Sequence, residues 1–482
     1  MDYKSVIKFI SIIGMWLSIF LLLPILIGWA YKESYQSFLY FDIFLFSINA
    51  LFFLILRKHK INLKIKESIL SVNLIWILLG IAGGMPLVLN THIGYADAFF
   101  EAISGFTTTG ATVYSDIESL PHMILFHRSL MHWLGGMGII VLGVGLFSII
   151  NPTGSMSLFK AESTGIQLQK LTPKIKDNAM TLWIIYLLIT LIDAILLDIA
   201  GMDKFDAVNH AFSTISTGGF STKNASLAYW ADNDAIMWIT TFFMTLSGIN
   251  FMAHLKLYYD DISGYKSEEV KYYLAVFFIL SIALSITHYY NETSGSFYES
   301  VKHSFFTISS ILTTTGFVSI DYEQWGQATA SIIIIAMLIG ANAGSTAGGI
   351  KVIRYVVLIK ILFAEMKKIL HPNAVINVFL DKQRIKSSVF LSVFGFLFLY
   401  AFTVLATALY LYIRGYDSLT SLTAALATVG NIGPGFGDVG AVDNFGFFSW
   451  YDKIFLSFSM IIGRLECYTF FLLFVRDFWR KF

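Results

Sequence analysis

The chain has 482 residues, of which 56% are hydrophobic and only 13% charged, with a formal net charge of +1. Soluble globular domains carry roughly a quarter of charged residues, so this composition excludes a water-soluble domain. Many apolar runs reach about 20 residues, enough to cross a hydrocarbon core of about 30 Å, and indicate a polytopic membrane protein. The near-zero net charge gives no indication of nucleic-acid binding, and the single Cys467 excludes an intrachain disulfide.

The chain begins with two apolar runs, residues 7–30 and 38–56, which predict an opening pair of membrane spans. The first run is longer than a typical signal-peptide core, and no small-residue cleavage site follows it, so we expect a retained span. The loop at 57–66 carries five Lys or Arg residues. The positive-inside rule therefore predicts a cytoplasmic loop and a cytoplasmic N-terminus.

One plan then recurs four times: a long apolar span, a short helix, a loop rich in Thr and Gly, and a return span. The short helices of about 10–15 residues cannot cross a bilayer. In order, the expected span, short helix and return span are 68–89, 96–106 and 123–150; 178–200, 205–215 and 235–258; 271–289, 298–312 and 328–363; and 387–413, 418–427 and 452–474. These repeats predict five segments, residues 1–66, 67–177, 178–265, 266–385 and 386–482.

Charge is distributed unevenly along these repeats. The linkers between them hold Lys160, Lys170, Lys174, Lys176, Lys266, Lys271, Lys367, Lys368, Lys382, Arg384 and Lys386. The segments after the loops instead hold Asp116, Glu118, Asp321, Glu323 and Asp438. The linkers and the C-terminus are therefore expected in the cytoplasm, and the loop mouths outside. Outer acids would raise the local cation concentration, although each is also consistent with an ordinary solvated loop residue.

The four loops predict a selectivity filter for a cation. Backbone carbonyls replace the water shell of an ion without a fixed charge, and glycine adopts the positive φ angles that such a loop needs. A single loop of this kind is typical of a tight turn, but four copies in register are not. The loop glycines are taken as Gly110, Gly218, Gly316 and Gly430, with second glycines at Gly135, Gly248, Gly340 and Gly463. The candidate ion-binding residues are Thr108, Thr109, Gly110, Ser216, Thr217, Gly218, Thr314, Thr315, Gly316, Thr428, Val429, Gly430 and Asn431, with ion contacts at Thr109, Gly110, Thr217, Gly218, Thr315, Gly316, Val429 and Gly430.

The third return span is too long for a plain helix and contains four glycines near its middle. Glycine disfavours a helix by roughly 1 kcal/mol relative to alanine, which predicts a break inside the membrane. The expected loop is a candidate gate, with close packing of small residues as the alternative. It comprises Gly340, Ala341, Asn342, Ala343, Gly344, Ser345, Thr346, Ala347, Gly348 and Gly349. Lys351 and Arg354, which follow it, either reach toward the interface or hold the loop.

Arg464 is expected near the middle of the last span, where a charge is costly unless it faces a cavity or a partner. Glu466 lies at i+2, on a different helix face, and is a poor partner. We therefore expect Arg464 to face the pore and to raise the barrier for cations, with a tie to backbone carbonyls as the alternative. Scattered histidines, and the lack of phosphate-binding, dinucleotide or nucleophile-elbow motifs, argue against an enzyme or an organic cofactor.

Four such units resemble the Trk/Ktr/HKT superfamily of potassium transporters over essentially the whole chain, particularly its bacterial Trk branch. The matching stretches are residues 132–140, 344–354, 365–375, 429–435 and 463–466, with the additional first pair of spans. The resemblance implies an all-α polytopic fold of four helix–pore helix–filter loop–helix repeats around a pseudo-fourfold pore, preceded by two extra helices. It implies potassium as the transported ion, because a serine in the first loop is associated with sodium-preferring plant relatives and all four positions here are glycine.

The resemblance also implies an intramembrane gating loop at residues 340–349 with Arg464 beside it. It further implies a homodimer in the bacterial cytoplasmic membrane and a cytoplasmic ring of regulatory subunits that bind NAD(H), ATP or ADP, with residues 364–386 as the expected contact. The alternatives are a sodium-coupled or sodium-conducting relative and a secondary transporter of a small organic solute. Parallel rather than inverted repeats argue against the last.

Overall fold

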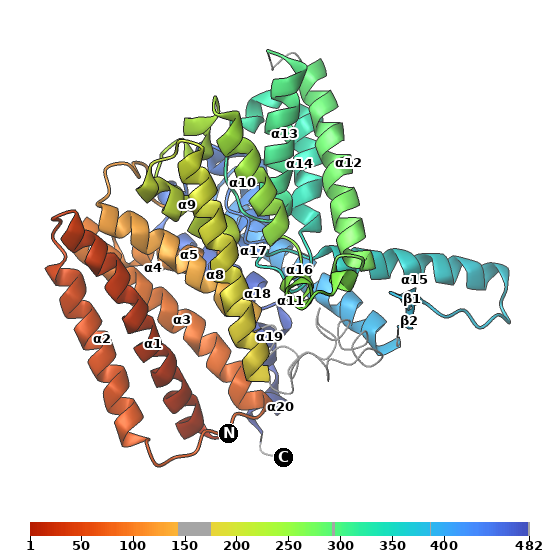
Figure 1. Ribbon diagram of the computed structural model, residues 1–482. Helices are drawn as coiled ribbons and strands as arrows, with labels where there is room; N and C mark the ends of the chain where they lie inside the picture. Colours follow the sequence, from red (N-terminus) through yellow and green to blue (C-terminus); the bar gives the residue numbers. More distant parts are fainter. Residues whose placement is uncertain (143–174, 292–294, 386, 481–482) are drawn as a thin grey trace.

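The computed structural model describes residues 1–142, 175–291, 295–385 and 387–480 (Figure 1). Its first three helices are α1 (Tyr3–Ala30), α2 (Gln36–Ile55) and α3 (Ile65–Thr91), and α1 packs on both α2 and α3. The side chain of Asp2 accepts a hydrogen bond from Ser5 N at 3.3 Å and thereby caps the start of α1. The predicted opening pair of long helices is confirmed.

The remaining helices follow the repeated order of long helix, short helix and return helix. They are α4 (Tyr95–Phe106), α5 (His122–Leu142), α8 (Ile175–Ile199), α9 (Lys204–Ile215), α10 (Asp234–Ser247), α11 (Phe251–Tyr258), α12 (Glu268–Tyr290), α13 (Phe297–Leu312), α14 (Gln327–Ile339), α15 (Val352–Leu370), α16 (Ser387–Ile413), α17 (Ser418–Val429), α18 (Trp450–Arg464), α19 (Tyr468–Phe471) and α20 (Arg476–Trp479). The predicted end of the first return span, residues 143–150, and the linker after it lie outside the described residues.

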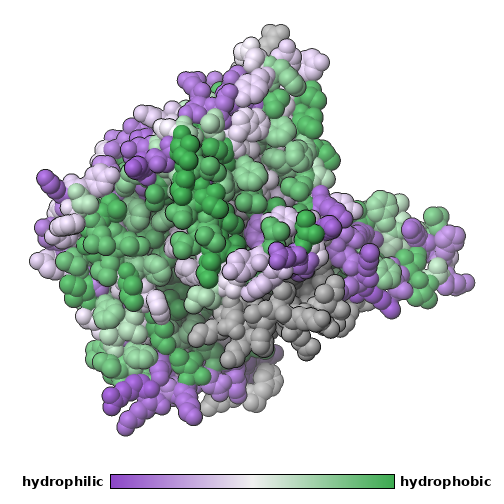
Figure 2. Space-filling model, viewed as in Figure 1, coloured by the Kyte–Doolittle hydropathy of each residue, from purple (hydrophilic) through white to green (hydrophobic). Residues whose placement is uncertain are grey.

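In the described part of the chain, six helices are long and apolar enough to cross a membrane. Two further helix pairs, α10 with α11 and α18 with residues 468–474, would each form one span that bends by 92° and 111°. Figure 2 shows hydrophobic surface over the long helices, with hydrophilic surface gathered toward both ends. The protein is therefore an all-helical, multi-pass membrane protein, apart from one short hairpin of β1 (Phe379–Leu380) and β2 (Gln383–Arg384) that the all-α expectation missed.

Contacts between helices from different repeats close a ring. The return helix α5 packs on the short helix α9, α10 packs on α13, α14 packs on α17, and α18 packs on α4. Each short helix also packs on the long helix before it, in the pairs α3 with α4, α8 with α9, α12 with α13, and α16 with α17. The contact of α18 with α4 joins the final return helix to the first short helix and so closes the ring.

Among the described residues, three return segments are broken, whereas the sequence predicted one such break. The predicted break in the third is confirmed, since α14 ends at Ile339 and α15 begins at Val352. The expected continuous spans at 235–258 and 452–474 are wrong. The second breaks because Gly248 ends α10 and the Asn250 side chain accepts a hydrogen bond from Met252 N, capping α11. The last breaks after Arg464, where Glu466 and Cys467 both have a φ of 55°.

Candidate functional site

The four short helices end in the same backbone conformation. The residue after each helix is Thr107, Ser216, Thr313 or Gly430, and the next one has a φ of 53° at Thr108, 54° at Thr217, 58° at Thr314 and 54° at Asn431. Two residues further on stands a glycine with positive φ: 82° at Gly110, 86° at Gly219, 80° at Gly316 and 100° at Gly433. Residues 107–110, 216–219, 313–316 and 430–433 are therefore equivalent, and we call them the first to fourth loops.

This equivalence corrects the register taken from sequence. Gly218 corresponds to Thr109 and Thr315, and Gly430 corresponds to Thr107, so neither is the counterpart of Gly110. Thr428 and Val429 lie in the last turn of α17 rather than in the fourth loop. The counterparts missed from sequence are Gly219, Ile432 and Gly433. All four loops share a Thr or Asn followed two residues later by Gly, and this pattern could have identified the counterparts. Aligning the loops on adjacent Thr-Gly pairs concealed it.

The equivalent glycines make a closed set of contacts between loops. A Cβ atom built on Gly110 would lie 2.2 Å from the carbonyl oxygen of Gly218, and one on Gly219 would lie 2.0 Å from that of Thr315. A Cβ on Gly316 would lie 2.1 Å from the oxygen of Ile432, and one on Gly433 would lie 2.6 Å from that of Thr109. Each loop therefore touches the next, and the fourth touches the first.

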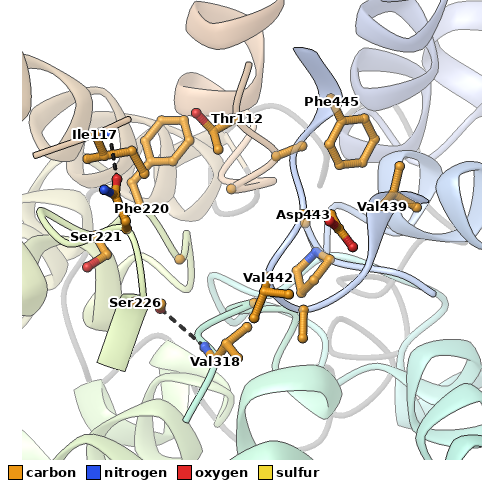
Figure 3. A pocket seen from close by; sticks show the side chains of 18 of the residues that line it. Thr112, Ile117, Phe220, Ser221, Ser226, Val318, Val439, Val442, Asp443 and Phe445 are labelled. Atoms are coloured by element: carbon orange, nitrogen blue, oxygen red, sulfur yellow. Dashed lines mark hydrogen bonds between the residues drawn. The ribbon is translucent and has the colours of Figure 1, made fainter. Parts of the chain in front are cut away.

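The carbonyl oxygens of Thr109, Gly218, Thr315 and Ile432 consequently lie in one ring. Oxygens without fixed charge are ligands that can replace the water of a cation and still release it. The four glycines also line a single pocket (Figure 3), which is bounded further out by Thr112, Phe220, Ser221, Val439 and Asp443. Any side chain at these glycines would meet backbone, which explains why the positions are glycine.

The hydroxyl groups of the loops mostly stabilise the helix ends. The Oγ1 atoms of Thr107 and Thr313 donate to the carbonyls of Ile103 and Ser309, and each lies 2.7 Å from the hydroxyl of Thr109 or Thr315. Asn431 Nδ2 donates to Thr109 Oγ1 at 2.9 Å and joins the fourth loop to the first. These buried hydrogen bonds hold the loop backbone in place.

The outer acidic residues join neighbouring repeats. Asn224 donates to Asp116 Oδ1 at 3.0 Å through its side chain and to Glu118 Oε1 at 3.0 Å through its backbone N–H. In the opposite half, Gly437 N donates to Glu323 Oε1 at 2.6 Å. Burial raises the pKa of Glu323 above its ordinary value, and nearby carboxylates add to this effect. Asp116 and Glu118 are nevertheless exposed, as expected of solvated loop residues, whereas Glu323 is partly buried.

The glycine-rich loop at residues 340–349 lies against the ends of the short helices. Gly348 N donates to Thr314 Oγ1 at 2.7 Å, and a Cβ on Gly348 would lie 2.3 Å from the carbonyl oxygen of Gly430. Thr346 Oγ1 donates to Ile215 O at 3.1 Å. The loop therefore touches the second, third and fourth repeats where the four loops begin.

Three cations surround the glycine-rich loop. Arg464 donates from one terminal nitrogen to Thr346 O at 2.8 Å, while its Nε and second terminal nitrogen have no partner among the described residues. Lys351 Nζ donates to Ala347 O, and Arg354 donates to Ile350 O at 2.7 Å. Arg464 ends α18 instead of lying within a continuous span, which corrects the sequence expectation. Glu466 pairs with Arg354 at 2.8 Å and not with Arg464. The expectation that it is no partner of Arg464 is confirmed, but Glu466 lies beyond the end of α18 and not on another face of that helix.

The break between α10 and α11 holds the other half of the glycine-rich loop. Asn342 N donates to Gly248 O at 3.1 Å, and Phe251 N donates to Gly344 O at 3.0 Å. A Cβ on Gly344 would lie 2.9 Å from Asn250 Oδ1. Ala343 N donates to Glu269 Oε1 at 2.5 Å. Sequence reasoning assigned no role to this break, although Gly248 followed by Asn250 is a helix stop and a helix start.

Comparison with known proteins agrees with this geometry. The model of the TrkH family, described as a cation transport protein, matches residues 34–288 and 272–481. The chain belongs to this family of cation transport proteins, which are not enzymes.

Individual relatives match over the full length. The chain is 34% identical to "Trk system potassium uptake protein TrkH" of Escherichia coli strain K12 and 35% identical to the protein of that name from Vibrio parahaemolyticus, with 100% of each chain covered in both cases. The structure superposes on the crystal structure of the potassium transporter TrkH from Vibrio parahaemolyticus with a TM-score of 0.91, 34% identity and full coverage of both chains. The fold is thus that of TrkH.

Proposed function

We propose that this chain takes up potassium across the bacterial cytoplasmic membrane through a pore bounded by the four loops. The observation that carries this proposal is the closed ring of loop contacts, from Gly110 to Gly218, Gly219 to Thr315, Gly316 to Ile432, and Gly433 to Thr109. A ring of backbone carbonyls suits a dehydrated cation that must bind and leave again. Full-length relatives named potassium uptake proteins support potassium as that cation.

In this proposal the chain forms four repeats around a pseudo-fourfold axis, at residues 67–177, 178–265, 266–385 and 386–482, after an N-terminal pair at 1–66. The N- and C-termini lie in the cytoplasm. The ion is bound by the carbonyls of Thr109, Gly218, Thr315 and Ile432 and by those of the adjoining loop residues. The ring contacts of α18 with α4 and of α5 with α9 support one common pore.

The glycine-rich loop is the gate in this proposal. Its hydrogen bond from Gly348 N to Thr314 Oγ1 keeps it against the inner end of the loops. Arg464 holds Thr346 O and places a positive charge below the ring, which raises the barrier for a cation. Conduction then requires the loop to leave Thr314 and Arg464 to release Thr346.

The proposed assembly is a homodimer with a cytoplasmic ring of regulatory subunits that bind NAD(H), ATP or ADP. Helix α15 projects away from the other helices (Figure 1) and begins directly after the glycine-rich loop. Exposed apolar side chains along it are Ile359, Leu362, Phe363, Met366, Ile369 and Leu370. Such a face favours a partner, and we assign it to the second copy of this chain, with the hairpin and linker at residues 371–386 toward the regulatory ring.

The test is rescue of a bacterium that lacks potassium uptake, with growth and 86Rb⁺ uptake measured at low potassium. The unaltered chain is expected to restore both, and sodium is not expected to compete. The Gly110→Ser variant is expected to lose selectivity, because its Cβ would meet Gly218 O. Gly415→Ser is the control, since Gly415 has a similar φ of 97° and no heavy atom nearby. Sodium uptake that is independent of potassium would contradict the proposal and favour a sodium-conducting relative.

A further inference from the structure

A buried ion pair lies behind the exit of the first loop. Glu101 on α4 and Arg128 on α5 are joined by a 2.8 Å contact between Arg128 Nε and Glu101 Oε1, and their side chains are 0% and 1% exposed. A buried pair is costly unless further hydrogen bonds satisfy both partners, so its other contacts indicate what it does.

The Glu101 carboxylate holds the segment that leaves the first loop. Thr112 Oγ1 donates to Glu101 Oε1 at 3.0 Å, and Val113 N donates to Oε2 at 2.9 Å. Thr112 and Val113 stand two and three residues after Gly110. The carboxylate therefore fixes the direction in which the backbone leaves the ring.

The Arg128 guanidinium extends the contact to the second loop. One terminal nitrogen donates to Ser221 O at 3.3 Å, and the other donates to Thr112 Oγ1 at 3.2 Å. Its central carbon lies 4.1 Å from the centroid of the Phe220 ring. Phe220 and Ser221 directly follow Gly219. Arg128 also lines the outer pocket together with the four loop glycines, as Figure 3 shows for its neighbours Thr112, Phe220 and Ser221.

With the loops aligned in the corrected register, the positions equivalent to Glu101 and Thr112 can be compared in all four repeats. Nine residues before the loop glycines stand Glu101, His210, Thr307 and Ala424, and two residues after them stand Thr112, Ser221, Val318 and Gly435. In the second repeat, His210 Nε2 and Ser221 Oγ lie 2.8 Å apart, at the positions of Glu101 and Thr112. The third and fourth repeats have no ionisable residue at either position. One buried network therefore runs from Glu101 through Arg128 and Ser221 to His210.

We propose that Glu101 and Arg128 are positioning residues that determine ion selectivity by holding the exits of the first and second loops at a fixed separation. Glu101 has a second effect, because it neutralises the Arg128 charge at the mouth that a cation enters. The rigid planar guanidinium of Arg128 reaches Glu101, Ser221 and Thr112 from three separate nitrogens, whereas all the donors of a lysine sit on one ammonium nitrogen. This inference rests on the proposed function of potassium uptake.

The experiment uses the full-length protein in the uptake-deficient bacterium and in proteoliposomes. It compares Arg128→Lys, Glu101→Gln and the double variant Glu101→Gln/Arg128→Gln. Arg128→Lys is expected to lower the ratio of potassium to sodium uptake because it keeps the charge and loses the fork. Glu101→Gln is expected to raise the potassium concentration for half-maximal uptake roughly two- to fivefold, since it exposes one uncompensated charge. That increase should shrink at high ionic strength.

The double variant Glu101→Gln/Arg128→Gln separates the positioning of the loop exits from the effect of the Arg128 charge. It is expected to return the half-maximal concentration toward that of the unaltered chain while leaving selectivity low. Lys302→Gln is the matched control, because Lys302 is a buried cation whose partners Ala231, Asp234 and Glu299 all lie outside the four loops. It is expected to leave selectivity unchanged.

Unchanged selectivity in both Arg128→Lys and Glu101→Gln, at normal membrane amounts, would overturn the inference. If Arg128→Lys fails to accumulate, the nearly isosteric Glu101→Gln is the deciding variant. Its ratio of potassium to sodium uptake and the salt dependence of its potassium concentration for half-maximal uptake are then the two measurements. A chain that takes up no potassium even when unaltered contradicts the proposed function itself. The two failures are therefore distinguishable.

Discussion

At the scale of single residues, the loop glycines are defined by backbone angle and by the neighbour they meet. Gly433 has a φ of 100°, and its Cβ position lies 2.6 Å from Thr109 O in the first loop. Gly415 has nearly the same φ, 97°, but no heavy atom within 4 Å of its Cβ position. A side chain would therefore strain the backbone at either glycine, but of the two only Gly433 takes part in the ring.

Replacing Gly433 by alanine is expected to reduce potassium uptake strongly and to lower its selectivity over sodium. Both Gly433→Ala and Gly415→Ala carry about 1–3 kcal/mol of backbone strain, so the comparison isolates the displaced carbonyl of Thr109. Uptake of 86Rb⁺ with sodium competition measures the effect. Equal behaviour of the two variants would mean that Gly433 is outside the conducting ring.

Arg464 is the second residue with a prediction of its own. Arg464→Ala removes the hydrogen bond to Thr346 O and the positive charge below the ring, so ion flux through the reconstituted protein is expected to rise. Arg464→Lys keeps the charge and should have an intermediate effect. Flux that falls or stays unchanged, with a normal amount of protein, would contradict the barrier role.

At the scale of elements, two broken helices interlock. The break between α10 and α11 exchanges backbone hydrogen bonds with the glycine-rich loop between α14 and α15, through Gly248 O and Phe251 N. Helix α18 contributes Arg464 from the opposite side. The proposed gate is therefore held by the second and fourth repeats together, whereas the sequence assigned control to the third and fourth alone.

Asn250 tests this clamp, because its side chain caps α11 and contacts Gly344. Asn250→Ala is expected to weaken the start of α11 by about 1 kcal/mol and to increase basal flux without changing selectivity. Asn250→Ser retains a capping oxygen and serves as the control, with a smaller effect. Proteoliposome flux and selectivity are the measurements, and a loss of selectivity without increased flux would argue against a gating role.

At the scale of the whole molecule, closure of the helix ring through α18 and α4 makes the four repeats one unit, while α15 extends beyond it. The exposed apolar side chains of α15 include Ile369 and Leu370, which are 77% and 75% exposed. A single copy leaves this surface uncovered among the described residues, consistent with the proposed homodimer.

The double variant Ile369→Asp/Leu370→Asp is expected to shift the detergent-solubilised protein from dimer to monomer, because charged groups resist burial in an interface. Light scattering coupled to size-exclusion chromatography measures the mass. Ile61→Asp, in the loop between α2 and α3, is the control and should leave the mass unchanged. A dimer that persists in the double variant would place the interface elsewhere.

Features that depend on local composition could be predicted from the amino-acid sequence. Apolar runs predicted the long helices, and four glycines predicted the break between α14 and α15. Both predictions follow from hydropathy and helix propensity, which act over a few neighbouring residues.

Contacts between distant atoms depend instead on how the repeats pack together. Residues from different repeats meet in the ring of carbonyls that defines the register of Gly219 and Gly433, in the clamp at Asn250, and in the contacts of Arg128 with Phe220 and Ser221. A pattern such as Thr-Gly occurs at both Gly218 and Gly110, and nothing local shows that only one is equivalent. A Cβ on Gly110 would lie 2.2 Å from a carbonyl oxygen of the second loop, and one on Gly219 would lie 2.0 Å from a carbonyl oxygen of the third loop. These contacts, which depend on packing between repeats, identify Gly219 as the counterpart of Gly110.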